Sequence, residues 1–183
     1  FAMLFFGLQQ FTEALPSSAE IPSFISSLDA ISSLGFGSIC IFLLIGILLT
    51  VIVQASTATF IISLALCFNG WIPFTMGCAM ILGSNIGTCV TPLWASLKAN
   101  TMAKRAAVGH LVFNLIGVIW ALVILDYFCE FIDWLCISFH WGSATLPENT
   151  PFGLAMFHTL FNAINLCLLL PFNKQIVNLI TRL

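Results

Sequence analysis

The chain has 183 residues, of which 60% are hydrophobic and 7% are charged, and its mean hydropathy is +1.10. An average soluble domain is about one-quarter charged, so this composition excludes a soluble globular fold and a disordered chain. With five Lys and Arg against seven Asp and Glu, the chain lacks a basic patch for nucleic acid. The 68 consecutive residues between Asp29 and Lys98 carry no charged side chain, which predicts an integral protein of the lipid bilayer.

The N-terminal part does not predict a membrane span. Residues 3–15 have the pattern of an amphipathic helix, and residues 17–35 are Ser-rich and acidic, too polar to cross a bilayer. The chain starts at Phe1, and no positively charged segment precedes an apolar stretch, so no signal peptide is expected. We expect the chain to be cut from a longer protein.

Residues 36–69 are almost wholly apolar. As one helix they would be roughly 51 Å long at about 1.5 Å per residue, whereas the hydrocarbon core of a bilayer is about 30 Å thick. The polar cluster Gln54-Ala55-Ser56-Thr57 lies near the middle of this stretch. We expect the chain to bend there, so that its two arms form a hairpin or a broken helix.

A second polar cluster, residues 83–88 (Gly-Ser-Asn-Ile-Gly-Thr), is expected to interrupt the next apolar stretch and leave short arms at 72–82 and 88–97. Irregular backbone at membrane depth is tolerated only where protein buries it or where it lines a cavity. Small and hydroxyl residues also let helices pack closely, which for one cluster alone is the better explanation. Two clusters, each with an amide side chain (Gln54 and Asn85), favour a binding site.

These clusters suggest how an uncharged site could hold an anion and a cation. Ser56, Thr57 and Thr59 are expected to begin the helix after the first break, and Asn85 and Thr88 the helix after the second. Such residues cap helix N-termini, whose free N–H groups attract anions, while freed carbonyls bind a coupling cation. Na⁺ suits these neutral oxygens, whereas a transition metal is not expected because no Cys/His ligand spacing is present.

Residues 106–125 and 151–171 are two clear spans. All five basic residues fall within 98–105 and 174–182, two crossings apart, whereas 126–150 is acidic. By the positive-inside rule the basic segments are expected on the cytoplasmic side of a cell membrane that the chain crosses several times, with the acidic loop outside.

Each clear span contains one H-x-x-F-N pattern, from His110 to Asn114 and from His158 to Asn162. Residues four apart lie on one face of a helix. We interpret both histidines as structural, paired with an amide or a carbonyl, rather than as proton relays.

The chain resembles the sodium–phosphate cotransporter family, the type II animal proteins and their bacterial relatives, in four blocks that keep the family's order and spacing: VIVQASTATFIISLAL (51–66), ILGSNIGTCVTPLWASL (81–97), AKRAAVGHLVFNLIG (103–117) and FHTLFN (157–162). The family has two inverted repeats, each with a Gln-Ser-Ser motif at the tip of a re-entrant hairpin, and the two motifs together hold phosphate and sodium. The resemblance implies that this chain is the second repeat plus the closing helices, and that the first repeat, its partner, is missing.

The resemblance also assigns the site. The family's Gln falls on Gln54, its three hydroxyl residues on Ala55, Ser56 and Thr57, and Ala55 departs from the pattern because it lacks the hydroxyl. The implied phosphate ligands are Gln54, Ser56, Thr57, Asn85 and Thr88, and the implied sodium ligands are Gln54, Ser56, Thr57, Thr59 and Asn85.

We therefore predict an all-α polytopic membrane protein with re-entrant or broken helices, one half of an inverted-repeat transporter. Residues 1–97 would form the opening helix and hairpin repeat, and 98–183 the closing spans of the same domain. The expected function is sodium-coupled uptake of inorganic phosphate, without an organic cofactor. The alternatives are a carrier of another small anion, a structural or assembly subunit, or a membrane enzyme; the last is not expected, because 54–97 offers only hydroxyls, thiols and amides.

Overall fold

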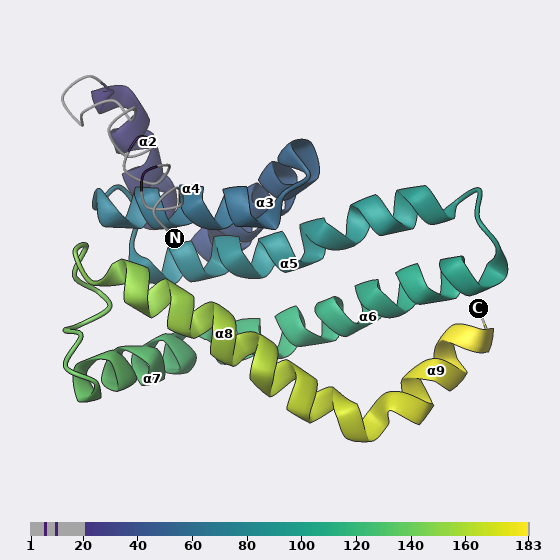
Figure 1. The fold of residues 1–183 in the computed structure, drawn as a ribbon. Helices are drawn as coiled ribbons and strands as arrows, with labels where there is room; N and C mark the ends of the chain where they lie inside the picture. The colour runs from purple at the N-terminus through teal and green to yellow at the C-terminus, as the bar shows by residue number, and fades with distance from the viewer. Residues whose placement is uncertain (1–5, 7–9, 11–20, 183) are drawn as a thin grey trace.

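The computed structural model describes residues 6, 10 and 21–182 and is built of helices (Figure 1). Most of the amphipathic helix expected at 3–15 lies outside the described residues. No strand occurs in the described part of the chain. Its helices are α2 (Pro22–Ser32), α3 (Phe36–Val53), α4 (Ser56–Phe68), α5 (Phe74–Ser96), α6 (Thr101–Val123), α7 (Leu125–Ser138), α8 (Thr150–Leu169), the 3₁₀ turn η1 (Leu170–Phe172) and α9 (Asn173–Arg182).

The prediction of an all-α polytopic membrane protein is confirmed. Among the described residues, four helical segments are long and apolar enough to cross a membrane: Phe36–Val53, Phe74–Ser96, Thr101–Val123 and Thr150–Asn178. The predicted spans at 106–125 and 151–171 correspond to α6 and α8. By contrast α2, with 11 residues, is too short to cross.

The bend predicted within residues 36–69 is present. The helix α3 ends at Val53 and α4 begins at Ser56, so only Gln54 and Ala55 lie between them. The two arms fold back on each other as a hairpin, because Thr50 and Thr59 on opposite arms are hydrogen-bonded. Both arms pack against α5 (Figure 1).

The break predicted at residues 83–88 is wrong, because α5 runs uninterrupted from Phe74 to Ser96. Nearly all of the predicted short arms at 72–82 and 88–97 belongs to this one helix of 23 residues, from Phe74 to Ser96. Its glycines are there for packing. A Cβ on Gly83 would collide with the carbonyl oxygen of Leu43 on α3, and one on Gly87 would lie 2.7 Å from the Thr50 Cβ. Gly83 and Gly87 thus form a G-x-x-x-G surface on which α3 approaches closely.

The polar residues of the same cluster leave the helix intact because they bond to its own carbonyls. Ser84 Oγ and Asn85 Nδ2 donate to the Ile81 oxygen at 3.0 and 3.1 Å, and Thr88 Oγ1 donates to the Asn85 oxygen at 2.8 Å. Asn85 and Thr88 therefore do not begin a helix, contrary to expectation. The central position of α5 suits this composition: 61% of its most apolar stretch is buried in the protein, against 28% for α3 and α6.

The acidic segment 126–150 is not a simple loop, since α7 occupies its first half. The buried residues of α7 recur at helical spacing and attach it to the bundle: Leu125, Phe128, Cys129, Ile132 and Cys136. Beyond α7, the Asp133 carboxylate holds the loop by accepting hydrogen bonds from Ser143 Oγ and the Ala144 N–H, both at 2.7 Å. The buried Asn165 links α8 to α6, because it accepts from Trp120 Nε1 at 3.2 Å and donates to the Phe113 oxygen at 3.3 Å.

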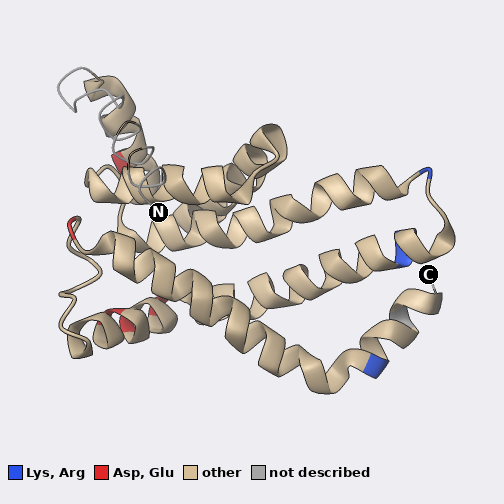
Figure 2. Ribbon diagram, in the orientation of Figure 1, with Lys and Arg blue, Asp and Glu red and all other residues tan. Residues whose placement is uncertain are grey.

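The charged residues lie at opposite ends of the bundle. Figure 2 shows Lys and Arg at the end formed by the α5–α6 turn, the start of α6 and α9, and Asp and Glu at the other end, on α2, α7 and the loop before α8. The segregation expected from the sequence is therefore present among the described residues. One end of the bundle is therefore basic and the other acidic, as expected for a membrane protein with a fixed orientation.

Candidate functional site

The tip of the α3–α4 hairpin has a strained backbone. Gln54 adopts the left-handed conformation, with φ 58° and ψ 25°, and its N–H donates to the Thr50 carbonyl at 2.8 Å to close the last turn of α3. A non-glycine residue in this conformation costs about 1–2 kcal/mol. Such strain persists only where the surrounding structure imposes it and is common at binding sites and switch regions.

The hairpin tip lies part-way along α5. Thr50, one turn before the tip, packs beside Gly87, which lies well before the end of α5 at Ser96. The hairpin therefore turns back before the end of α5, which continues past Gly87 to Ser96. The irregular backbone at Gln54 and Ala55 thus lies beside α5 rather than beyond its end.

The helix α4 begins without a side-chain cap. Its N-cap residue is Ala55, in an extended conformation with φ −144° and ψ 109°, and no side chain accepts a hydrogen bond from the first turn. The N-cap role expected for Ser56, Thr57 and Thr59 is thus wrong, although they do lie at the start of the helix. An alanine at this position leaves first-turn N–H groups to other acceptors.

A cavity of about 360 Å³ lies beside this helix start. Ser56 and Thr57 line it from α4, Ser84 from α5 and His158 from α8, and the rest of the wall is apolar: Phe60, Ile61 and Leu64. Three of the four sequence blocks that carry the family resemblance therefore meet at one place. The polar groups that converge there are three hydroxyls and one imidazole.

Not all predicted site residues reach this cavity. Gln54 is exposed at the hairpin tip, whereas Thr59 is fully buried with its hydroxyl 2.8 Å from that of Thr50. Asn85 and Thr88 are half-buried and engaged with carbonyls of their own helix. Of the predicted ligands, Ser56 and Thr57 line the cavity together and the other four do not line it.

Two lining residues were not predicted. Ser84 is 3% exposed and precedes Asn85 in the polar cluster at 83–88. Successive residues of a helix point in different directions, so Ser84 lines the cavity and Asn85 does not. His158 was interpreted as structural; its ring centroid lies 5.7 Å from that of Phe60, at the cavity wall. The signal available in the sequence was the block FHTLFN (157–162), which resembles the family and contains this histidine.

The two H-x-x-F-N patterns form the same local bond but have different surroundings. Asn114 Nδ2 donates to the His110 carbonyl at 3.0 Å, and Asn162 Nδ2 to the His158 carbonyl at 2.8 Å. His110 instead lines a separate hollow between the end of α5 and the start of α6. The sequence echo therefore reflects a repeated hydrogen bond within a helix, and of the two histidines His158 is the one that lines the cavity beside α4.

Comparison with known sequences is consistent with this geometry. The profile of the family described as Na⁺/Pi-cotransporter matches residues 3–126, which include the hairpin, α5 and α6. The uncharacterised protein YqeW of Bacillus subtilis (strain 168) is 33% identical over 138 residues, which are 75% of this chain and 41% of that protein. No solved structure matches the chain.

A second group of relatives has a name that refers to phosphate. The candidate inorganic phosphate export protein YjbB of Escherichia coli (strain K12) is 29% identical over 136 residues, covering 74% of this chain and 23% of that protein. The protein of the same name from Salmonella typhimurium is 25% identical over 147 residues. The chain thus spans less than half the length of these relatives.

Proposed function

We propose, since the chain belongs to the Na⁺/Pi-cotransporter family, that it forms part of a secondary active carrier that moves inorganic phosphate across the membrane together with Na⁺. The observation that carries this proposal is the cavity at the hairpin tip, where Ser56, Thr57 and Ser84 meet the uncapped start of α4. The first N–H groups of a helix favour an anion. Phosphate there would accept hydrogen bonds from hydroxyls and backbone.

The proposed phosphate ligands of this chain are Gln54, Ser56, Thr57, Asn85 and Thr88, to which the cavity adds Ser84 and His158. The proposed sodium ligands are Gln54, Ser56, Thr57, Thr59 and Asn85. Residues 30–97 contain no Lys or Arg, so the positive charge that balances phosphate has to come from another source. A co-bound Na⁺ on neutral oxygens supplies it, which couples the two solutes in one site.

The chain covers part of its relatives' length, so the complete site is proposed to include a second, inverted hairpin supplied elsewhere in the full-length protein. Transport would follow from alternating access, one bundle moving against the other. We propose a cell-membrane location with the basic end of the bundle on the cytoplasmic side. A carrier of another small anion and an assembly subunit are the alternatives that the flux experiment below tests.

The direction of transport distinguishes two candidate functions. Coupling to an inward sodium gradient favours uptake of phosphate, which is our first candidate. The name of the Escherichia coli relative describes export, and this favours the second. Right-side-out and inside-out vesicles with identical sodium gradients separate the two.

The experiment is flux of radiolabelled phosphate into vesicles that contain the full-length protein, with a gradient of NaCl or KCl. We expect flux with Na⁺ and background with K⁺, and a clear loss on Ser84→Ala. Ser138→Ala is the matched control, because that hydroxyl is exposed on α7 and bonds to its own helix. Equal flux in both salts would exclude sodium coupling, and sodium-driven flux of another anion alone would exclude phosphate.

A further inference from the structure

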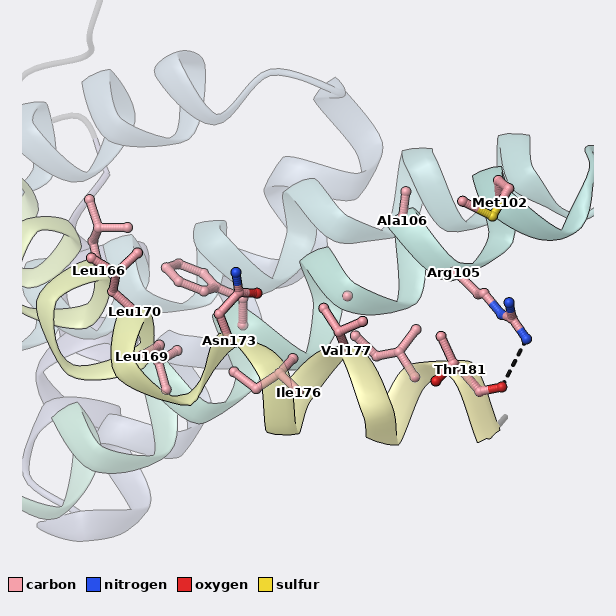
Figure 3. Close-up of a pocket in the computed structure, with 13 residues that line it drawn as sticks. Met102, Arg105, Ala106, Leu166, Leu169, Leu170, Asn173, Ile176, Val177 and Thr181 are labelled. Atoms are coloured by element: carbon pink, nitrogen blue, oxygen red, sulfur yellow. Dashed lines mark hydrogen bonds between the residues drawn. The ribbon is translucent and has the colours of Figure 1, made fainter.

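A second cavity lies at the basic end of the bundle, on the side of α6 that faces α9 (Figure 3). The chain bends at η1, which contains Pro171, so that α9 turns back towards the start of α6 (Figure 1). The resulting groove has a volume of about 530 Å³. It shares no lining residue with the hairpin cavity.

The wall of this groove is mainly apolar, and its uncharged polar residues are Asn173 and Thr181. Side chains from α6 and from α8–α9 face each other across it in Figure 3, and the large apolar ones labelled there are Met102, Leu166, Leu169, Leu170, Ile176 and Val177. Gly109 on α6 lets α9 pack closely there, because a Cβ at this position would lie 3.2 Å from Ile180 Cδ1. The occupant therefore has a long apolar part.

One end of the groove carries a guanidinium with a buried, unpaired Nε–H donor. Arg105 donates from Nη2 to the Thr181 carbonyl at 2.8 Å, which ties α6 to α9. Its Nε is buried and has no hydrogen-bond partner. A buried donor without a partner is costly, and a guanidinium favours phosphate oxygens. Among the described residues, Arg105 is the charged side chain that lines the groove, whereas Lys104 lines a different hollow between α5 and α6.

We propose that this groove binds one anionic phospholipid, with an acyl chain along the apolar wall and the headgroup phosphate on Arg105. Basic pockets between membrane helices on the cytoplasmic side bind such headgroups. A free phosphate ion would leave the apolar wall empty, and a zwitterionic lipid would match the basic end less well. The bound lipid would join α6 to α9.

The test measures lipid binding to the full-length protein in detergent by native mass spectrometry. The probes are dioleoyl phosphatidylglycerol and dioleoyl phosphatidylcholine, which share their acyl chains, with and without millimolar inorganic phosphate. The charge variants are Arg105→Gln and Arg105→Lys, with Lys98→Gln as control because Lys98 is exposed outside the groove. The steric variant is Ala106→Trp, since Ala106 lines the groove; its control is Ala155→Trp, an exposed site on α8 outside it.

Wild-type protein should prefer phosphatidylglycerol, and inorganic phosphate should not displace it. Arg105→Gln should weaken phosphatidylglycerol binding by roughly tenfold, the effect of one charge-assisted hydrogen bond, while Arg105→Lys retains part of the preference. Ala106→Trp should weaken both lipids, and both controls should behave as wild type. An unchanged preference in Arg105→Gln, unchanged binding in Ala106→Trp, or displacement by inorganic phosphate would each overturn the proposal. Melting temperatures of all variants show whether a loss arises from unfolding.

Discussion

The hydroxyl of Thr50 on α3 lies 2.8 Å from that of Thr59 on α4, and both side chains are buried. Thr50 also donates to the Gly46 carbonyl at 2.9 Å, so Thr59 is the donor within the pair. This bond joins the two arms directly behind the tip that carries Gln54 and Ala55. It therefore holds the irregular backbone of the candidate site in place.

The first prediction concerns this pair. Thr50→Val should leave the Thr59 hydroxyl without its acceptor, and Thr59→Val should remove the donor, so each should lower stability. The double variant should lose less than the sum, with a coupling free energy of about 0.6 kcal/mol, the average for hydrogen bonds between membrane helices, and at most about 1.7 kcal/mol. Thermal unfolding of the four proteins in detergent measures it. Strict additivity would mean that the two hydroxyls do not interact.

The same four proteins test the proposed role of Thr59 towards sodium. If its oxygen also contacts Na⁺, Thr59→Val should raise the sodium concentration needed for half-maximal phosphate flux, whereas Thr50→Val should not. Identical sodium dependence in both variants would limit Thr59 to a structural role.

The second prediction concerns Gly83, whose missing Cβ makes room for the Leu43 carbonyl. Gly83→Ala should destabilise by about 1–3 kcal/mol or more, because backbone cannot move aside as a flexible side chain does. Gly37→Ala on α3 is the matched control, since its Cβ would meet only Leu34 Cβ at an ordinary 3.6 Å. The melting temperatures of the two variants test this prediction. An equal decrease for Gly83→Ala and Gly37→Ala would contradict the close α3–α5 contact.

The bend at Gln54 was predicted correctly from the sequence, whereas the break at 83–88 was not. The bend at Gln54 was predictable because residues 36–69 are too long for one crossing and contain one polar cluster. The break at 83–88 was not, because Gly, Ser and Thr in a membrane segment mark either a broken helix or a packed one. What decides is the neighbouring helix: α3 lies against Gly83 and Gly87, and a single sequence does not reveal that contact.

The candidate site was predictable only in part, for a related reason. Family blocks located the segments, and the structure confirms that α4, α5 and α8 converge. Whether Ser84 or Asn85 faces the cavity depends on the position of each residue around a continuous helix. Because a break was expected at 83–88, no helical face could be assigned to these residues. His158 required knowing that α8 packs beside α4, a contact between residues far apart in the chain.

The third prediction concerns the loop after α7. Asp133 accepts two hydrogen bonds of 2.7 Å from Ser143 and Ala144, so Asp133→Ala should release this loop at a cost of about 1.5–3 kcal/mol. Hydrogen exchange at residues 140–149 should accelerate, while exchange in α5 stays slow. Glu130→Ala, an exposed acidic site on α7, is the control. Equal exchange in Asp133→Ala and wild type would show that the loop is held by other contacts.

The fourth prediction concerns orientation. Lys98→Cys and Glu148→Cys place thiols at exposed positions on opposite ends of the bundle. A membrane-impermeant maleimide added to intact cells should label Glu148→Cys at once and Lys98→Cys only after permeabilisation, because the basic end is expected in the cytoplasm. Wild-type protein reports the background from native thiols. The reverse pattern would invert the assigned topology.

The fifth prediction concerns the uncapped start of α4. Ala55→Ser should place a hydroxyl at the N-cap and raise stability by typically about 1 kcal/mol. Ser56→Ala should instead remove a hydroxyl that lines the cavity. If that hydroxyl contacts phosphate or Na⁺, its loss costs about 1–3 kcal/mol, or roughly five- to 150-fold in affinity.

The measurements for this last pair are melting temperature and the concentration dependence of phosphate and sodium flux in the full-length protein, at matched expression. Ala55→Ser should shift the melting temperature upwards with its sodium dependence retained, since it adds one small oxygen at an extended residue. Ser56→Ala should keep the melting temperature and lose affinity. The two effects are separable because Ala55 is the N-cap of α4, whereas Ser56 lines the cavity. If Ser56→Ala transports as wild type does, the cavity beside α4 is not the binding site, and the hairpin serves helix packing alone.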